Sequence, residues 1–598
     1  MNATISHDIN RPQAGVLVPL FAIRGAHDLG VGDVRSLREF IDWCAEMGFG
    51  VVNLLPLNEP GADPSPYNPI SAMAIDPLSI SLHPDDLEDV TEETYRARLS
   101  NLDLRRLSEG PVRYPEVRRL KSGLLEAAFE TFDTERNAKL TARARLFHEF
   151  VGEERAWLRP YTLFRILLEQ HGHERWPEWP EHQRNAAAAE SWLAQLPPEE
   201  RAGLERRATF YSYVQWIAQG QWLALHQYAT DRGVALMGDI PLGVSFYSAD
   251  VFTNPELFDL TWSCGAPPDA MSTGSPQEVG PTDAFRAQWG QNWGFPFYNW
   301  ARMREDGLLW WRRRVARVRA FFDLFRIDHI LGFYRVYAFP WRPEQNEQFI
   351  GIGEEEARRR TGGRLPQFYP RGDDSAASRE ANRSDGESLL RILIDEVGAA
   401  AVIGEDLGCV PDYVRPSLRS LGIAGYKVPM WEQESDGALT PGKKYESLSV
   451  AMYVTHDHAP LRAQWNEWAR SVRRAARGRG EHQPNPAAEI AAKSMRQLWE
   501  FTEAPLSRKP PVRFTNGLHR ALIAALLRSN SSLAIFMITD LFARTERFNV
   551  PGAVGEANWT QRMHVPIKEL GTQPETRWLR KLLQETGRAA AASRGPSR

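Results

Sequence analysis

The chain has 598 residues, of which 42% are hydrophobic and 25% are charged. This is the composition of a folded globular protein, and it excludes a chain that is disordered throughout. The 72 Lys and Arg residues nearly balance the 76 Asp and Glu residues, for a formal net charge of −4. Because neither sign dominates, nothing recruits a phosphate backbone or an anionic membrane, and we expect neither nucleic acid nor membrane as a partner.

The three cysteines and the N-terminus bear on the compartment. Cys44, Cys264 and Cys409 form neither a disulfide framework nor a CxxC metal pattern, which favours a reducing cytoplasm. The N-terminus lacks a basic region followed by an apolar run, and no stretch of about 18 apolar residues occurs, so we expect no signal peptide and no membrane span. No GxGxxG follows a predicted strand and no GxxxxGK[ST] occurs, which argues against the usual nucleotide sites.

Short apolar runs alternate with amphipathic helical segments along the chain. Strands are predicted at residues 16–20, 51–55, 234–240, 323–327, 401–403, 447–454 and 533–538. Helices are predicted at residues 36–46, 213–230, 308–321, 388–397 and 414–421. Such alternation is typical of a parallel sheet with both faces covered. About eight units over this length favour an α/β fold of the closed (β/α)₈ barrel type over an open doubly wound sheet.

Two kinds of insertion interrupt this rhythm. One segment is rich in Glu, Arg, Ala and Trp and is interpreted as a helical subdomain beside the barrel. Two other segments, at about 241–300 and 353–386, are interpreted as loop insertions. The second is polar and is interpreted as a long mobile loop. A basic run at residues 470–486 is interpreted as a solvated helix end and loop. The predicted division is barrel start 1–80, inserted helical subdomain 81–205, barrel remainder 206–570 with insertions at about 241–300 and 353–386, and C-terminal helix with disordered tail 571–598.

Acidic residues stand at the ends of several predicted strands, namely Asp239, Asp328, Glu405 with Asp406, Asp457 and Asp540. In a parallel barrel these ends share one rim, where functional side chains gather. Retaining cleavage of a glycosidic bond needs two carboxyl groups about 5–5.5 Å apart, one as nucleophile and one as proton donor. A third can stabilise the oxocarbenium charge. The pattern therefore predicts a catalytic rim of carboxylates.

Other interpretations of these acids stay open at this point. A single Asp after a strand is commonly a helix cap or turn residue. An acidic rim can also hold a metal ion, but no HExxH or EF-hand spacing supports that, and we expect no metal.

The segments around these acids resemble glycoside hydrolase family 77, the amylomaltases or 4-α-glucanotransferases, which are relatives of the α-amylases. The similarity runs in order from about residue 15 to residue 565. It is carried by SPYNPISAMAIDPLSISL, GDIPLGVSFYSADVFTNPELFDL, APPDA, GQNWGFPFYNW, FRIDHILGFYR, GEDLG, THD and NVPGAVGEANW.

The resemblance implies a role for each matching residue. Asp328 is expected to be the nucleophile, Glu405 the general acid/base and Asp457 the stabiliser of the transition state. Residues expected to bind substrate are Tyr67, Asp239, Asp269, Gln291, Trp293, Arg326, His456 and Asn549. Taken alone, Trp293 would be assigned to core packing and His456 to a core histidine.

The expectation for Arg326 also rests on the residues themselves. Arg326 stands two residues before Asp328, so in a strand it points to the same side and can keep the nucleophile ionised. Asp406 is interpreted either as support for its neighbour or as a cap or turn residue.

The chain also departs from the family pattern. Ile330 and Leu331 follow RIDH where many relatives have Phe-Arg, and His458-Ala459 follows THD where relatives often have Asn or Leu-Pro. The segment between Pro268 and Gly290 is longer than in compact members. These differences leave the three acids in place and leave acceptor preference and chain-length specificity undetermined.

The resemblance therefore implies a cytoplasmic 4-α-glucanotransferase. We expect it to cut α-1,4-glucans (maltodextrins, amylose, glycogen) with retention and to pass the cut segment to the 4-hydroxyl of another glucan, glucose or maltose. No cofactor is expected, because protonation alone activates the leaving oxygen. One alternative is a retaining α-glucan hydrolase that uses the same site, and a more distant one is a glycan-binding protein without activity. The sequence indicates no oligomeric state.

Overall fold

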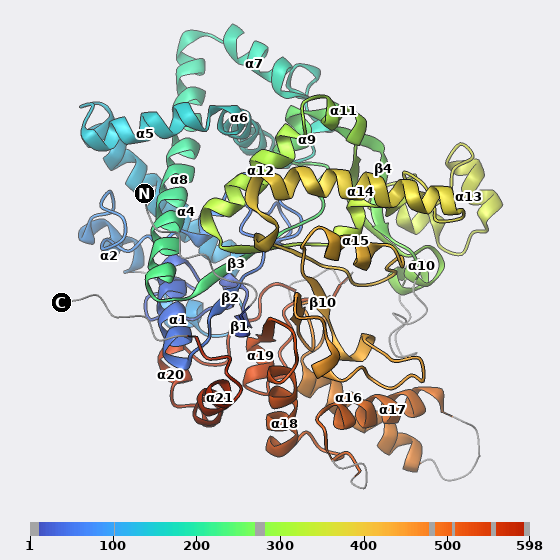
Figure 1. Ribbon diagram of the computed structural model, residues 1–598. Coiled ribbons are helices and arrows are strands. Elements are labelled where there is room, and N and C mark those ends of the chain that lie inside the picture. Colours follow the sequence, from blue (N-terminus) through green and yellow to red (C-terminus); the bar gives the residue numbers. More distant parts are fainter. Residues whose placement is uncertain are drawn as a thin grey trace.

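The computed structural model describes residues 11–100, 102–268, 281–477, 485–504, 509–551 and 558–590. Eight short parallel strands form a barrel near the centre of the molecule (Figure 1). In pairing order they are β10 (Gly425–Lys427), β11 (Ser449–Ala451), β12 (Leu533–Met537), β1 (Gln13–Leu17), β2 (Val51–Asn53), β3 (Ala235–Ile240), β6 (Leu324–Ile327) and β9 (Val402–Gly404).

The barrel closes where the two edge strands of this series meet. Ile403 forms a parallel bridge with Ala424, and the Gly404 amide donates to the Ala424 carbonyl oxygen at 2.8 Å. The predicted (β/α)₈ barrel is confirmed. Strand β10 was not predicted, because its three residues, Gly-Tyr-Lys, lack an apolar run.

Helices cover the outside of the barrel (Figure 1). They are α1 (Val34–Met47), α8 (Pro198–Asp231), α12 (Leu309–Phe321), α14 (Ala376–Val397), α15 (Val414–Ser420), α16 (Leu461–Arg477), α17 (Pro486–Phe501) and α18 (Asn516–Leu527). Helix α1 shows how the sequence sets the bounds: the Asp33 side chain accepts from the Ser36 amide at its start, and Gly48, with φ of 91°, ends it. The β10–β11 connection carries only the 3₁₀ turns η10 (Pro429–Trp431) and η11 (Gly442–Lys444).

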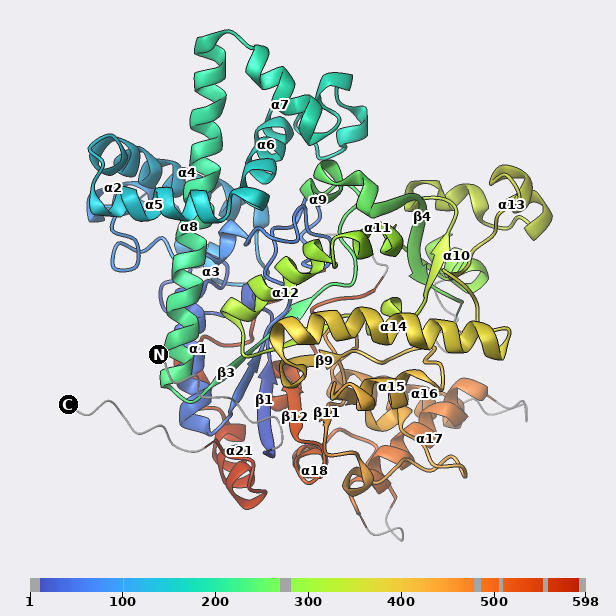
Figure 2. The same ribbon diagram turned by 45° about the horizontal axis from the view of Figure 1, so that its top comes forward.

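The long connection between β2 and β3 is helical. It contains α2 (Glu92–Leu99), α3 (Leu104–Ser108), α4 (Tyr114–Phe132), α5 (Ala142–Glu153), α6 (Arg155–His171), α7 (Ala186–Gln195) and α8. Figure 2 shows α6, α7 and the first part of α8 extending away from the strands at the top of the view, while the rest of α8 runs down beside α1. Helix α8 passes residue 205 without a break. The domain boundary expected at that residue stays a prediction.

The two insertions contain regular structure. Strands β4 (Phe258–Ala266) and β5 (Gln291–Tyr298) of the first insertion and β8 (Gln367–Tyr369) of the second form an antiparallel sheet with β7 (Val336–Phe339), which lies between the insertions, in the order β5-β4-β7-β8. Short helices α9 (Ala249–Thr253), α10 (Pro281–Trp289), α11 (Trp300–Glu305) and α13 (Glu354–Arg360) accompany it.

The structure differs from the expectation of a long mobile loop at residues 353–386. Helix α13 and the first half of α14 occupy much of this segment. The Ser375 side chain caps α14, and Arg383 pairs with Glu380 and Glu387 on the outer face of the helix. The polar composition thus belongs to a helix with an exposed charged face, a pattern that composition alone does not separate from a loop.

The C-terminal segment closes the opposite end of the barrel from the strands' carboxyl ends. The last helices of the chain are α19 (Ile538–Leu541), α20 (Ile567–Leu570) and α21 (Pro574–Glu585). The segment after α21 contains Arg588, which is 2% exposed. All five guanidinium N–H groups of Arg588 reach backbone carbonyl oxygens, those of Gln13, Leu527, Ser529, Ser531 and Ser532. The predicted disordered tail lies almost entirely outside the described residues.

Within the described ranges, no helix combines the length and the apolar character needed to cross a membrane.

Candidate active site

Asp239, Arg326 and Asp328 lie together at the carboxyl ends of β3 and β6. Arg326 Nε donates to Asp239 Oδ1 at 3.0 Å, and its Nη2 donates to Asp328 Oδ1. The other oxygen of Asp239 accepts from the Tyr67 hydroxyl at 2.6 Å. The side chains of Arg326 and Asp239 are 5% and 3% exposed, whereas that of Asp328 is 28% exposed. Asp328 is therefore the carboxyl of this group that a ligand can reach.

Glu405 lies beside Asp328 because β9 pairs with β6. The Glu405 amide donates to the Ile327 carbonyl oxygen at 3.0 Å, and Glu405 Oε2 accepts from the His329 amide at 2.7 Å. His329 directly follows Asp328 and has a φ of 42°, in the left-handed region that residues other than glycine seldom adopt. This bend of the backbone directs the His329 amide to Glu405. The residue that follows Asp328 therefore holds the Glu405 carboxylate in place.

Asp457 approaches the same place from the loop that follows β11. Its Oδ1 accepts from Asn549 Nδ2 at 2.6 Å and lies 3.3 Å from His456 Nε2. The Asp457 side chain is 39% exposed, while His456 is 1% exposed. His456 Nδ1 is buried and has no hydrogen-bond partner among the described residues. Asp457 thus stands open beside a histidine that keeps one ring nitrogen free.

The three acids differ in how strongly they hold a proton. Burial raises the pKa of Asp328 to about 7, against the opposing effect of Arg326. Burial also raises the pKa of Glu405 well above its usual range, and the carboxylates of Asp328 and Asp457 add to this. Burial acts on Asp457 too, but His456 and Asn549 outweigh it and lower its pKa. Since Arg326 bonds Asp328 and not Glu405, the proton stays longest on Glu405 as the pH rises.

Aromatic rings form one wall of the site. Tyr67 stacks on His456 with ring centroids 4.9 Å apart and planes 8° apart. Trp559, which is 5% exposed, packs against both rings at 5.8 Å. Burial lowers the pKa of His456 to about 4, so the imidazole is neutral near pH 7. The wall therefore offers a flat, uncharged surface next to the carboxylates.

A second aromatic group comes from the antiparallel sheet. Trp293 on β5 packs edge to face against His329 at 5.0 Å, and its indole N–H reaches Gln291 Oε1 at 3.4 Å. The structure thus brings Trp293 and Gln291 to the side of the site where Glu405 lies. Asp269, also expected to bind substrate, lies outside the described residues.

Two strand-end acids take no part in this arrangement. Asp406 is 2% exposed and accepts from the Tyr426 amide at 2.6 Å and from Arg415 Nε at 3.0 Å. Gly425 permits this approach, because a Cβ there would stand 2.9 Å from Asp406 Oδ2. Asp540 is 3% exposed and accepts from the Leu461 amide at 2.8 Å, so it fixes the start of α16.

No group of three or more His, Cys, Asp or Glu side chains within the described ranges is arranged to hold a metal ion. Arg326 supplies the positive charge among the carboxylates Asp239 and Asp328.

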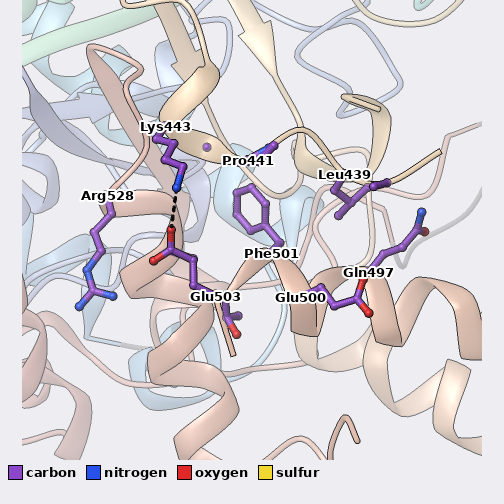
Figure 3. Close-up of a pocket in the computed structure, with 12 residues that line it drawn as sticks. Leu439, Pro441, Lys443, Gln497, Glu500, Phe501, Glu503 and Arg528 are labelled. Carbon is purple, nitrogen blue, oxygen red and sulfur yellow. Dashed lines mark ion pairs between the residues drawn. The ribbon is translucent and has the colours of Figure 1, made fainter. Parts of the chain in front are cut away.

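A cavity of about 230 Å³ lies elsewhere, between the β10–β11 connection and helices α17 and α18. Figure 3 shows the Phe501 ring at its centre, with Lys443 and Glu503, whose charged groups are 3.9 Å apart, on one side. None of the strand ends that carry the acids contributes to its lining. The cavity belongs to the connection that lacks an α-helix and is separate from the candidate active site.

Sequence reasoning missed several residues that the structure places at the site. His329 was quoted only within RIDH, and its backbone bend has no signal in its residue type. Trp559 was named only as the last residue of NVPGAVGEANW, with no role. Trp431, 46% exposed, lies with its ring 5.1 Å from that of His458, one residue after Asp457. The departure from the family pattern at His458 could have drawn attention to this pair.

Comparisons with known proteins identify the family and the fold. A family model described as 4-alpha-glucanotransferase matches residues 18–568. The 4-alpha-glucanotransferase of Chlamydia pneumoniae is 29% identical over 94% of this chain and 93% of its own. An amylomaltase from Streptococcus agalactiae, solved in complex with acarbose, aligns with a TM-score of 0.70 at 22% identity, covering 97% of this chain and 100% of that one. The amylomaltase from Corynebacterium glutamicum gives a TM-score of 0.73 at 21% identity, covering 96% and 75%.

Proposed function

Because the chain belongs to glycoside hydrolase family 77, the 4-α-glucanotransferases, we propose that Asp328, Glu405 and Asp457 carry out the two displacements of its reaction. The chain is a 4-α-glucanotransferase, which transfers a segment of an α-1,4-glucan with retention. The position of the three acids around one aromatic wall supports this assignment of residues.

In the first displacement, a carboxylate oxygen of Asp328 attacks the anomeric carbon of the donor glucan. The bond from that carbon to the glycosidic oxygen breaks, and the oxygen takes the proton of Glu405. The shortened glucan leaves with a new 4-hydroxyl, and the transferred segment stays as an ester on Asp328. Arg326 suits this step, because it opposes the effect of burial on the pKa of Asp328, favours the carboxylate form and holds it in place.

The second displacement runs the same chemistry in reverse. Glu405, now ionised, accepts the proton of an acceptor 4-hydroxyl, and the acceptor oxygen attacks the anomeric carbon. The bond to Asp328 breaks and its carboxylate is restored. Asp457 accepts hydrogen bonds from hydroxyls of the reacting glucose, and these strengthen as positive charge develops on the ring.

One observation carries this assignment: the two neighbouring carboxyl groups have opposite surroundings. Asp328 accepts a hydrogen bond from a buried guanidinium, while Glu405, among the described residues, accepts a hydrogen bond only from a backbone amide. Such a pair separates into one ionised and one protonated acid near neutral pH, as a retaining mechanism requires.

The substrate is an α-glucan, and the remaining residues suit the binding of its rings. We assign Tyr67, backed by Trp559, to the reacting glucose, with Asp239 holding the Tyr67 hydroxyl. His456 and Asn549 orient Asp457 and face the same sugar. Trp293, Gln291 and Asp269 are assigned to neighbouring glucose units.

Glucose and maltose are proposed as acceptors, and Trp431 as the surface that binds them. Its exposed ring lies beside His458, next to Asp457, at the barrel end where the acids lie. An acceptor ring stacked there competes with water for the intermediate, which favours transfer over hydrolysis.

The cytoplasm is proposed as the compartment, consistent with three free cysteines, of which Cys44 and Cys264 are buried and Cys409 is exposed.

Product analysis with maltotriose tests this proposal. Transfer yields free glucose together with maltodextrins longer than the substrate, and their formation should disappear in Asp328→Ala and Glu405→Ala. If only shorter sugars form, the enzyme is a hydrolase. If sugars bind but the wild-type protein forms no product, the protein is a glycan-binding protein without activity.

A further inference from the structure

Asp457 is held less firmly by the barrel than the other two acids. Asp328 and Glu405 directly follow their strands, and their amides continue the sheet through bonds to Ile240 and Ile327. Asp457 stands six residues after the end of β11, and within the part of the chain that the structure describes its amide donates only to the Thr455 hydroxyl, at 3.3 Å. The hydrogen bonds of the sheet therefore do not fix the position of Asp457, and contacts from other segments must do so.

Arg547 supplies such a contact from a segment 90 residues further along the chain. Its Nη2 donates to the carbonyl oxygen of Asp457, and its Nε donates to the carbonyl oxygen of Asn549 at 2.5 Å. Asn549 in turn donates from Nδ2 to Asp457 Oδ1 at 2.6 Å. The three residues form a closed ring of hydrogen bonds that includes both the backbone and the carboxylate of Asp457.

We propose that Arg547 is a positioning residue that sets the place of Asp457 by bridging its backbone to that of Asn549. The inference rests on the role of Asp457 given under the proposed function. A guanidinium suits this task because its donors have fixed directions, so two carbonyl oxygens bound to one fork are fixed relative to each other. Lysine, with a rotating ammonium on a flexible stem, cannot fix two acceptors in this way.

The expected consequence is kinetic. Asp457 acts on charge that develops in the transition state, so a small displacement affects the chemical step more than ground-state binding. A misplacement of about 1 Å can lower the rate about 100-fold. Arg547→Ala should therefore lower kcat about 100-fold while KM for maltotriose changes less than about threefold. Arg547→Lys should fall between Arg547→Ala and the wild type.

Arg462 offers a matched control on the same pair of segments. Its Nη1 donates to the Ala543 carbonyl oxygen at 2.9 Å, so it also joins the start of α16 to the segment after β12, but it does not contact Asp457. Arg462→Ala should keep kcat within about threefold of the wild type. Similar melting temperatures for Arg462→Ala and Arg547→Ala would separate positioning from general stability.

The decisive experiment is a double-mutant cycle with Asp457→Asn, measured as glucose released from maltotriose. If Arg547 acts through Asp457, adding Arg547→Ala to Asp457→Asn lowers kcat by less than about threefold. Multiplicative losses, or a kcat of Arg547→Ala equal to that of Arg462→Ala, would overturn the inference. If Arg547→Ala does not fold, Arg547→Lys takes its place in the same cycle. A near-normal kcat in Asp457→Asn would instead refute the role proposed for Asp457.

Discussion

Replacing Arg326 with Gln tests the electrostatics on which the mechanism depends. The guanidinium donates to both Asp328 and Asp239, and Arg326 is 4% exposed, so little solvent screens the charge. An arginine in contact lowers a carboxyl pKa by about one to three units. Arg326→Gln should raise the pKa of Asp328 by that amount, which corresponds to roughly 1.4–4 kcal/mol. The acid limb of kcat/KM should then move to higher pH by one to three units, because Asp328 must be ionised to attack.

Arg326→Gln should also lower the free energy of unfolding, and the loss should depend on pH. Loss of Arg326 raises the folded-state pKa values of two buried acids further above their unfolded values, so the folded variant binds more protons. Its stability relative to the wild type should therefore fall as the pH rises, reaching a loss of about 3–5 kcal/mol near neutral pH and less near pH 5.

The assay is the initial rate of glucose release from maltotriose between pH 4 and 9, with denaturation by urea at pH 5 and pH 8. Arg415→Gln is the control, since Arg415 pairs with the buried Asp406, whose carboxylate accepts from Arg415 and from the Tyr426 amide and, among the described residues, forms no ion pair with Arg326. An acid limb at the same pH in Arg326→Gln and the wild type, or an equal move in Arg415→Gln, would refute the reasoning.

Three further substitutions test other parts of the structure. Asp328→Ala should abolish transfer yet leave maltodextrin binding, followed by calorimetry, within about tenfold, because it removes chemistry rather than ground-state contacts; residual turnover near wild type would show a wrong nucleophile. Trp431→Ala should raise the acceptor KM about two- to tenfold and increase hydrolysis, as expected for a lost stacking contact; an unchanged product ratio contradicts this. Arg588→Met should lower the free energy of unfolding in urea by about 2–4 kcal/mol, since five carbonyl oxygens each lose a hydrogen bond and four of these bonds are buried, whereas the exposed Arg580→Met on α21 should change it little.

The fold class followed from local patterns because a covered parallel barrel imposes them on the sequence. Strands buried on both faces are continuous apolar runs, and the helices between them show apolar residues at helical spacing. The pattern failed where strands are short or polar. Strand β10 is held in the barrel by its neighbours β9 and β11, and three of the four strands of the antiparallel sheet, β4, β5 and β8, come from segments interpreted as loops.

The relation of Arg326 to Asp328 is also local, since residues two apart in a strand share a side. The contacts that bring different strand ends and loops of the site together join distant parts of the chain. Tyr67 meets Asp239 across 172 residues, and Asn549 meets Asp457 across 92. Nothing in either segment specifies its partner.

The sequence by itself indicated which acids stand at strand ends or shortly after them, and it favoured a closed barrel. Only the tertiary structure decided which of them share a site, with Asp328 and Glu405 side by side and Asp406 and Asp540 in supporting contacts. It also decided which acid keeps its proton. The physical reason is that a pKa depends on burial and on the nearest charge, and both are set by segments that meet only when the chain has folded.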